Sequence, residues 1–249
     1  MLTASAAPCI RTAPLLSHNS LPLATVLLGA LGRPDVKDQY MMPSKLLFLP
    51  GALGRMDFWL PAAELIRHPA QKTHVGWPGF GPTPADPGVN GIDDLVAMVV
   101  DQLDGPCALV AQSMGGIVAI RAALARPERV THLVLAATSG GMDIAGLGAQ
   151  DWRALVRQDF PALPDWFINE HEDLTGQLSK LRMPVLLLWG DADPISPVAV
   201  GQKLAHHLPH ASLQVFNGAD HDLAYTHAAA VAALIGQHLA MQAKQASIR

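Results

Sequence analysis

The sequence predicts an α/β fold in which a mostly parallel central sheet carries helices on both faces. Short apolar runs without polar alternation are typical of strands covered on both sides, and they occur at 45–49, 73–76, 107–111, 131–137, 184–189 and 212–216. Helical segments lie between these runs, and alternating strands and helices imply a parallel sheet. Such sheets bind ligands beyond the carboxyl ends of their strands, so we expect the chemistry there.

The helices between these strands have boundary signals of their own. Residues 92–103 place apolar side chains on one stripe, and Gly105-Pro106 follows them as a helix terminator. A later helix is expected to begin at Pro197, with Ser196 as its N-cap. The last helix is expected over about 223–243.

Length and composition limit the classes of protein that fit. The chain has 249 residues, of which 50% are hydrophobic and 15% charged, so it can bury a large core. The net charge of −4 and the lack of a basic block argue against a nucleic-acid partner. Two cysteines, Cys9 and Cys107, predict no disulfide framework and a cytoplasmic protein. The apolar stretch 21–31 is too short to span a membrane.

The domain boundary is expected near residue 43. Residues 1–42 lack clear periodicity and are rich in Pro, Ser, Ala and Leu, and Met41-Met42 directly precede the first strand. We interpret 1–42 as a loose N-terminal extension or a mis-assigned start, and 43–249 as a single domain.

A candidate nucleophile lies in the segment Ala111-Gln112-Ser113-Met114-Gly115-Gly116. An apolar run precedes this segment and a helical stretch, 117–126, follows it. A strand, a sharp turn and a helix with serine at the apex form a nucleophile elbow. The turn needs small residues two before and two after the serine, and Ala111 and Gly115 satisfy this requirement. The start of a helix beneath Ser113 also favours negative charge nearby.

The partners that a serine nucleophile needs follow two later strands. Asp193 lies in the loop after the run 184–189, and His221 lies in the loop after 212–216. We predict Ser113 as nucleophile, His221 as general base and Asp193 as the acid that orients the histidine. Asp191 is a competitor for the role of Asp193, although we expect it to serve the turn. His206, His207 and His210 are interpreted as an exposed helix end rather than a metal site.

The chain order Ser113, Asp193, His221 resembles that of the α/β-hydrolase superfamily, especially its small bacterial esterase-like members with a short lid. The resemblance covers roughly residues 44 to 240. It implies that Leu49-Pro50-Gly51-Ala52 is the oxyanion segment, with the backbone N–H groups of Ala52 and Met114 as donors and Leu53 as the alternative to Ala52. The family usually has two strands before this segment, which here only residues 1–42 could supply.

The resemblance also implies a lid insertion at about 140–183 with one to three small helices. Its aromatic side chains could form the pocket wall or merely pack the insertion onto the body. The same choice holds for Phe58 and Trp59, which could line the pocket or anchor the following helix. The expected pocket residues are Leu53, Phe58, Trp59, Trp152, Trp166 and Phe167.

Carboxylic-ester or thioester hydrolysis through an acyl-enzyme is the predicted activity, with a small-molecule ester as substrate and no cofactor or metal. Carbon–carbon bond hydrolases, lyase-like menaquinone-pathway enzymes and perhydrolases resemble the same pattern, because a fold does not fix a function. A non-catalytic ligand receptor on the same fold is a further alternative. Neither CxxC nor HExxH occurs. The oligomeric state is left open.

Overall fold

A single parallel sheet organises the part of the chain that the computed structural model describes, residues 41–168 and 173–241. Its strands lie in the order β2-β1-β3-β4-β5-β6, and every pair of neighbours is parallel. The strands are β1 (Lys45–Leu49), β2 (Gln71–His74), β3 (Cys107–Gln112), β4 (Val130–Ala136), β5 (Val185–Gly190) and β6 (Ala211–Phe216). The predicted α/β fold class is confirmed.

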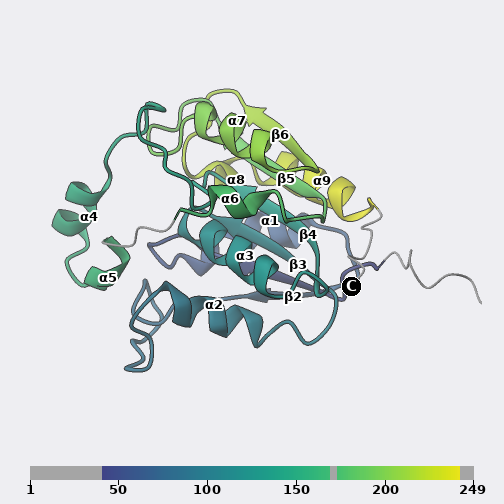
Figure 1. The fold of residues 1–249 in the computed structure, drawn as a ribbon, viewed down its shortest axis with the longest axis horizontal. Coiled ribbons are helices and arrows are strands. Elements are labelled where there is room, and N and C mark those ends of the chain that lie inside the picture. The colour runs from purple at the N-terminus through teal and green to yellow at the C-terminus, as the bar shows by residue number, and fades with distance from the viewer. Residues whose placement is uncertain (1–40, 169–172, 242–249) are drawn as a thin grey trace, which may run out of the picture. The chain divides into compact units, whose positions relative to one another are not determined.

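Helices cover both faces of the sheet because successive side chains of each strand point to opposite sides. In β1, Leu47 and Leu49 belong to one apolar cluster, whereas Leu46 and Phe48 belong to the other. The helices α2 (Ile92–Val100), α3 (Met114–Ala125) and α7 (Val198–His207) supply the first cluster. The helices α1 (Leu60–Leu65), α8 (Leu223–Thr226) and α9 (Ala228–Leu239) supply the second (Figure 1).

The two edge strands correct the expectation that all six strands are covered on both faces. The four central strands are buried, but every residue of β2 and β6 is partly or fully exposed. An edge strand has a neighbour on one side only, so its side chains are less covered. Strand β2 also begins at Gln71, two residues before the predicted run.

The helix boundaries differ from the sequence expectation in three places. The helix predicted over 92–103 is α2, which ends at Val100, and a turn rather than helix leads to Gly105. The last helix is interrupted at His227, which separates α8 from α9. Ser196 is not the N-cap of α7; Pro197 occupies that position, and no side chain caps the helix.

The segment between β4 and β5 contains three short helices, α4 (Arg153–Asp159), α5 (Asp165–Ile168) and α6 (Thr175–Leu178). Figure 1 shows α4 and α5 standing apart from the helices that cover the sheet. No helix among the described residues is long and apolar enough to cross a membrane. The predicted extension 1–42, apart from its last two residues, and Cys9 lie outside the described residues.

Candidate active site

Ser113 occupies a strained turn at the carboxyl end of β3, directly before α3. Its backbone has φ 53° and ψ −121°, in a region that residues other than glycine rarely adopt. Gly115 lies so close to the end of β1 that a β-carbon there would overlap the carbonyl oxygen of Pro50 and lie 2.9 Å from that of Leu49. The requirement for a small residue two positions after the serine therefore comes from contact with β1.

Thr138, two residues beyond the end of β4, stabilises this turn from the other side. The hydroxyl of Thr138 donates a hydrogen bond to the carbonyl oxygen of Ser113 at 2.7 Å and accepts one from the N–H of Gly140 at 3.2 Å. A β-carbon on Gly116 would lie 2.6 Å from the Thr138 Cβ. The conformation of Ser113 is thus fixed by contacts with two neighbouring strand ends.

The structure pairs His221 with Asp193, as the sequence predicts. His221 Nδ1 lies 2.7 Å from Asp193 Oδ2. Asp193 is 3% exposed, and its other oxygen accepts backbone N–H groups from Ile195 at 2.8 Å and Ser196 at 3.0 Å. Buried carboxylates need such partners, and these bonds hold the carboxylate in one orientation. Ser196 therefore serves the site through its backbone rather than as a helix cap.

The competing acid, Asp191, has a different partner. Its Oδ1 accepts the N–H of Gly218 at 2.6 Å, and the side chain is otherwise exposed. This bond ties the loop after β5 to the loop after β6, which carries His221. Asp191 therefore serves the turn, and of the two acids it is Asp193 that lies against the imidazole.

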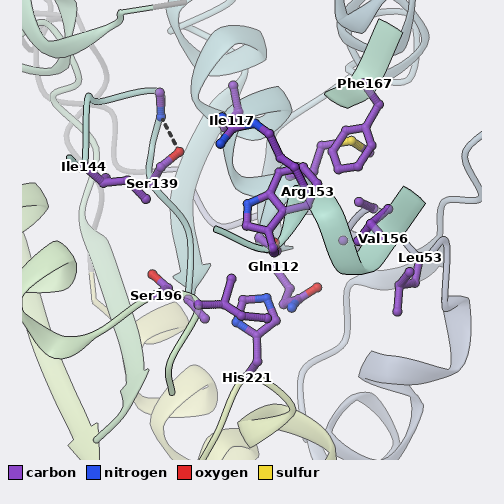
Figure 2. A pocket seen from close by; sticks show the side chains of 18 of the residues that line it. Leu53, Gln112, Ile117, Ser139, Ile144, Arg153, Val156, Phe167, Ser196 and His221 are labelled. Carbon is purple, nitrogen blue, oxygen red and sulfur yellow. Dashed lines mark hydrogen bonds between the residues drawn. The ribbon is translucent and has the colours of Figure 1, made fainter. Parts of the chain in front are cut away.

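Ser113 and His221 line the same cavity, which has a volume of about 660 Å³. Figure 2 shows His221 projecting into it from the loop before α8. Within residues 41–168 and 173–241 no hydrogen bond joins Ser113 to His221, although Asp193 already orients the imidazole. Hydrogen bonds between catalytic groups are often long without substrate and tighten when substrate binds.

The loop after β1 is held by two buried indoles. Trp59 Nε1 donates to the carbonyl oxygen of Leu49 at 3.2 Å, and Trp77 Nε1 donates to that of Pro50 at 2.9 Å. No hydrogen bond of the described residues is donated by the backbone N–H of Ala52 or of Met114. Both residues also line the cavity that contains Ser113.

The cavity wall includes most of the residues predicted for it. Leu53, Phe58, Trp152, Trp166 and Phe167 all line the cavity. Trp59 does not line it; this buried indole supports the loop after β1 instead.

The aromatic side chains of the 140–183 insertion have both of the roles considered for them. Trp152 and Phe167 stack with their ring centroids 5.0 Å apart, and both face the cavity. Phe80, outside the insertion, makes edge contacts with Trp166 at 5.6 Å and with Phe167 at 5.8 Å. The same rings therefore line the cavity and anchor the insertion.

Sequence reasoning missed a second group of lining residues. The ion pair between Arg55 and Asp222, 3.4 Å apart, joins the loop after β1 to the loop that carries His221. The carboxylate of Asp57, bonded to Arg55, raises the pKa of that guanidinium. These contacts join residues far apart in sequence, so no local pattern predicts them. The one sequence signal for this pair is that Asp222 directly follows His221. The other missed residues include Gln112, Ile117, Ser139, Met142, Ile144, Arg153 and Val156.

No group of three or more His, Cys, Asp or Glu side chains within the described ranges could hold a metal ion. His206 and His207 lie in the last turn of α7, and His210 lies beyond the end of this helix. The structure thus places all three at a helix end and its following turn.

Comparison with known proteins identifies the class. A model of the alpha/beta hydrolase family matches residues 46–180, and a second model, described as alpha/beta hydrolase fold, matches residues 153–228. The chain belongs to the alpha/beta hydrolase family.

Similar individual proteins include esterases, a phospholipase and a meta-cleavage product hydrolase. A pimeloyl-[acyl-carrier protein] methyl ester esterase from Nitrosomonas europaea is 27% identical over 71% of this chain and 88% of its own. A bacterial membrane phospholipase A has a similar fold, with a TM-score of 0.68 and 19% identity over 79% of this chain and 78% of that one. A thermophilic esterase from Thermogutta terrifontis has a TM-score of 0.63 and 20% identity over 80% and 90%. The predicted class, a carboxylesterase-type hydrolase, is confirmed.

Proposed function

We propose that this protein hydrolyses carboxylic esters through an acyl-enzyme formed on Ser113. The observation that carries the proposal is the 2.7 Å pair between His221 and Asp193 at the cavity that also contains Ser113. A nucleophile, a base and an acid that orients the base are the groups that acyl transfer to serine needs.

The two ring nitrogens of His221 have separate roles in this proposal. Nδ1 carries the proton donated to Asp193, so Nε2 is the basic nitrogen that takes the proton of the Ser113 hydroxyl during attack. Asp193 stabilises the positive charge that develops on the imidazole. His221 then returns the proton to the leaving alcohol, and in the second half-reaction it activates water against the acyl-enzyme.

Two backbone amides stabilise the tetrahedral intermediate. The N–H groups of Ala52 and Met114 have no acceptor in the described structure, and they flank Ser113 from the β1 loop and from the start of α3. Removing one such donor typically costs about 2.7–4 kcal/mol of transition-state stabilisation. The indole bonds of Trp59 and Trp77 support this role because they fix the loop before the substrate binds.

The cavity favours an acyl chain as the acid part of the substrate. Apolar and aromatic side chains form much of its wall, and its volume of about 660 Å³ lies within the usual range for small-molecule sites. The relative from Nitrosomonas europaea is named for a methyl ester of a carrier-bound acyl chain. We propose methyl esters of medium-length acyl chains as the substrate class, with the 140–183 insertion as a lid over them.

A panel of p-nitrophenyl and methyl esters of increasing chain length tests this proposal. The wild-type protein is expected to hydrolyse these esters, and Ser113→Ala to lose turnover. Ser212→Ala, at an exposed position of β6, is the matched control and should retain full activity. Persistent turnover by Ser113→Ala would refute the nucleophile. Turnover of a carbon–carbon hydrolase substrate, run in parallel, without ester hydrolysis would refute the reaction type.

A further inference from the structure

The residue before the nucleophile, Gln112, is mostly buried and turns its carboxamide toward the cavity, where solvent can reach it. Gln112 is 6% exposed and lines the cavity. Figure 2 shows its side chain projecting into the cavity that His221 also enters. None of the hydrogen bonds of the described residues involves its carboxamide. By contrast, Ser139 accepts the N–H of Gly141 at 3.3 Å, and Arg153 donates to the carbonyl oxygen of Ile168 at 3.3 Å.

The packing of Gly51 places this carboxamide beside the reacting groups. A β-carbon on Gly51 would overlap Gln112 Oε1 and would lie 3.2 Å from the Ser113 Cβ. The Gln112 amide and the nucleophile therefore border the same small space. Gly51 directly precedes Ala52, so this space also adjoins the N–H proposed to bind the oxyanion.

An unsatisfied amide at this place changes the energetics of substrate binding. A carboxamide has two N–H donors and one carbonyl acceptor, and burying such a group without a partner is unfavourable. Before substrate binds, water in the cavity can satisfy the amide. A wholly apolar acyl chain would expel that water and leave the amide unpaired. A chain with a hydroxyl or amide group beside its carbonyl would replace the water.

We propose that Gln112 is a specificity-determining residue that selects esters with a hydrogen-bonding group, a hydroxyl or an amide, directly beside the scissile carbonyl. The proposal rests on the proposed function, because it takes Ser113 as the position of that carbonyl. The apolar far wall of the cavity then holds the rest of the acyl chain. Sites built to pair with a substrate hydroxyl discriminate strongly against analogues that lack it, for the same reason.

The test compares two esters that differ only in one hydroxyl, methyl α-hydroxyoctanoate and methyl octanoate. The wild-type protein is expected to have a kcat/KM about 10-fold or more higher for the hydroxy ester, since 1.4 kcal/mol corresponds to a factor of ten. Gln112→Met, which keeps the length but removes the polar atoms, should abolish this preference. Gln214→Met, at an exposed position of β6, is the matched control and should keep it.

The outcomes separate the two proposals. Equal kcat/KM values for the two esters in the wild-type protein would overturn the role of Gln112, whatever the variants do. A loss of activity in Gln112→Met that is equal for both esters would also overturn it, because a purely structural role lowers both values together. If Gln112→Met does not fold, Gln112→Leu, which also lacks polar side-chain atoms, tests the same ratio, and an unchanged preference there refutes the assignment. Turnover of neither ester by the folded wild-type protein would overturn the proposed function, and with it this assignment.

Discussion

Acidification is expected to destabilise the protein through His238, a buried histidine of α9. Its side chain is 4% exposed, and Nε2 donates to the carbonyl oxygen of Leu133 at 3.0 Å. Its ring lies 5.2 Å from that of His132, edge to face. Burial, and then the neighbouring His132, lower the pKa of His238 to about 4. Desolvation likewise lowers the pKa of His132.

The sign and size of the effect follow from the difference between the folded and unfolded pKa. The unfolded chain binds a proton on His238 near pH 6.5, whereas the folded chain resists protonation until about pH 4. The unfolded state therefore holds more protons between these values, so the free energy of unfolding falls as the pH falls through this window. From pH 7.5 to pH 5 the loss attributable to His238 is about 2 kcal/mol.

Urea denaturation of the wild-type protein and of His238→Gln, at both pH values, measures this loss. Glutamine keeps an N–H donor but does not titrate, so the variant should lose about 2 kcal/mol less than the wild type on going to pH 5. His206→Gln, which replaces an exposed histidine of α7, is the control and should follow the wild type. An identical pH dependence in wild type and His238→Gln would refute the argument.

Three further substitutions test other parts of the account. Asp193→Asn should lower kcat about 10⁴-fold in an ester assay while the folded structure persists, because the amide favours the wrong tautomer of His221. A fall in kcat of less than tenfold would contradict the pairing of Asp193 with His221. Gly115→Val should lower the melting temperature measured by calorimetry, because the added side chain would collide with the end of β1. Gly236→Ala is the control and should not lower it, because no atom lies within 4 Å of the added carbon. Equal melting temperatures for the two variants would contradict the proposed contact. Phe167→Ala should raise KM for octanoyl esters more than for acetyl esters, because it removes the stacking partner of Trp152; a uniform change would argue against a role in chain binding.

The central strands could be predicted because their physical cause is local. Buried strands such as β3 and β5 have unbroken apolar sequences, and the residues that follow them, Ser113 and Asp193, are then placed at one end of the sheet. The predictions for the edge strands β2 and β6 were less accurate. Partial exposure depends on which strands become neighbours, so the exposure of β6 and the early start of β2 follow from topology rather than from local sequence.

The site was predictable where a turn has a sequence motif and not where distant segments meet. The elbow at Ser113 and the pair of His221 with Asp193 follow from motifs after strands. The indole of Trp59 instead donates to Leu49 and supports the loop, although the sequence suggested it for the pocket wall. The unpaired amide of Gln112 depends on its packing against Gly51, which no local pattern reveals.

The most direct test of the account is the site of covalent labelling by a fluorophosphonate probe. We expect one phosphonyl group per chain, attached to the proteolytic peptide that contains Ser113 and absent from Ser113→Ala, with His221→Ala labelled far more slowly. Labelling at a different residue, or labelling of Ser113→Ala at the wild-type rate, would contradict the claim that this serine is the nucleophile.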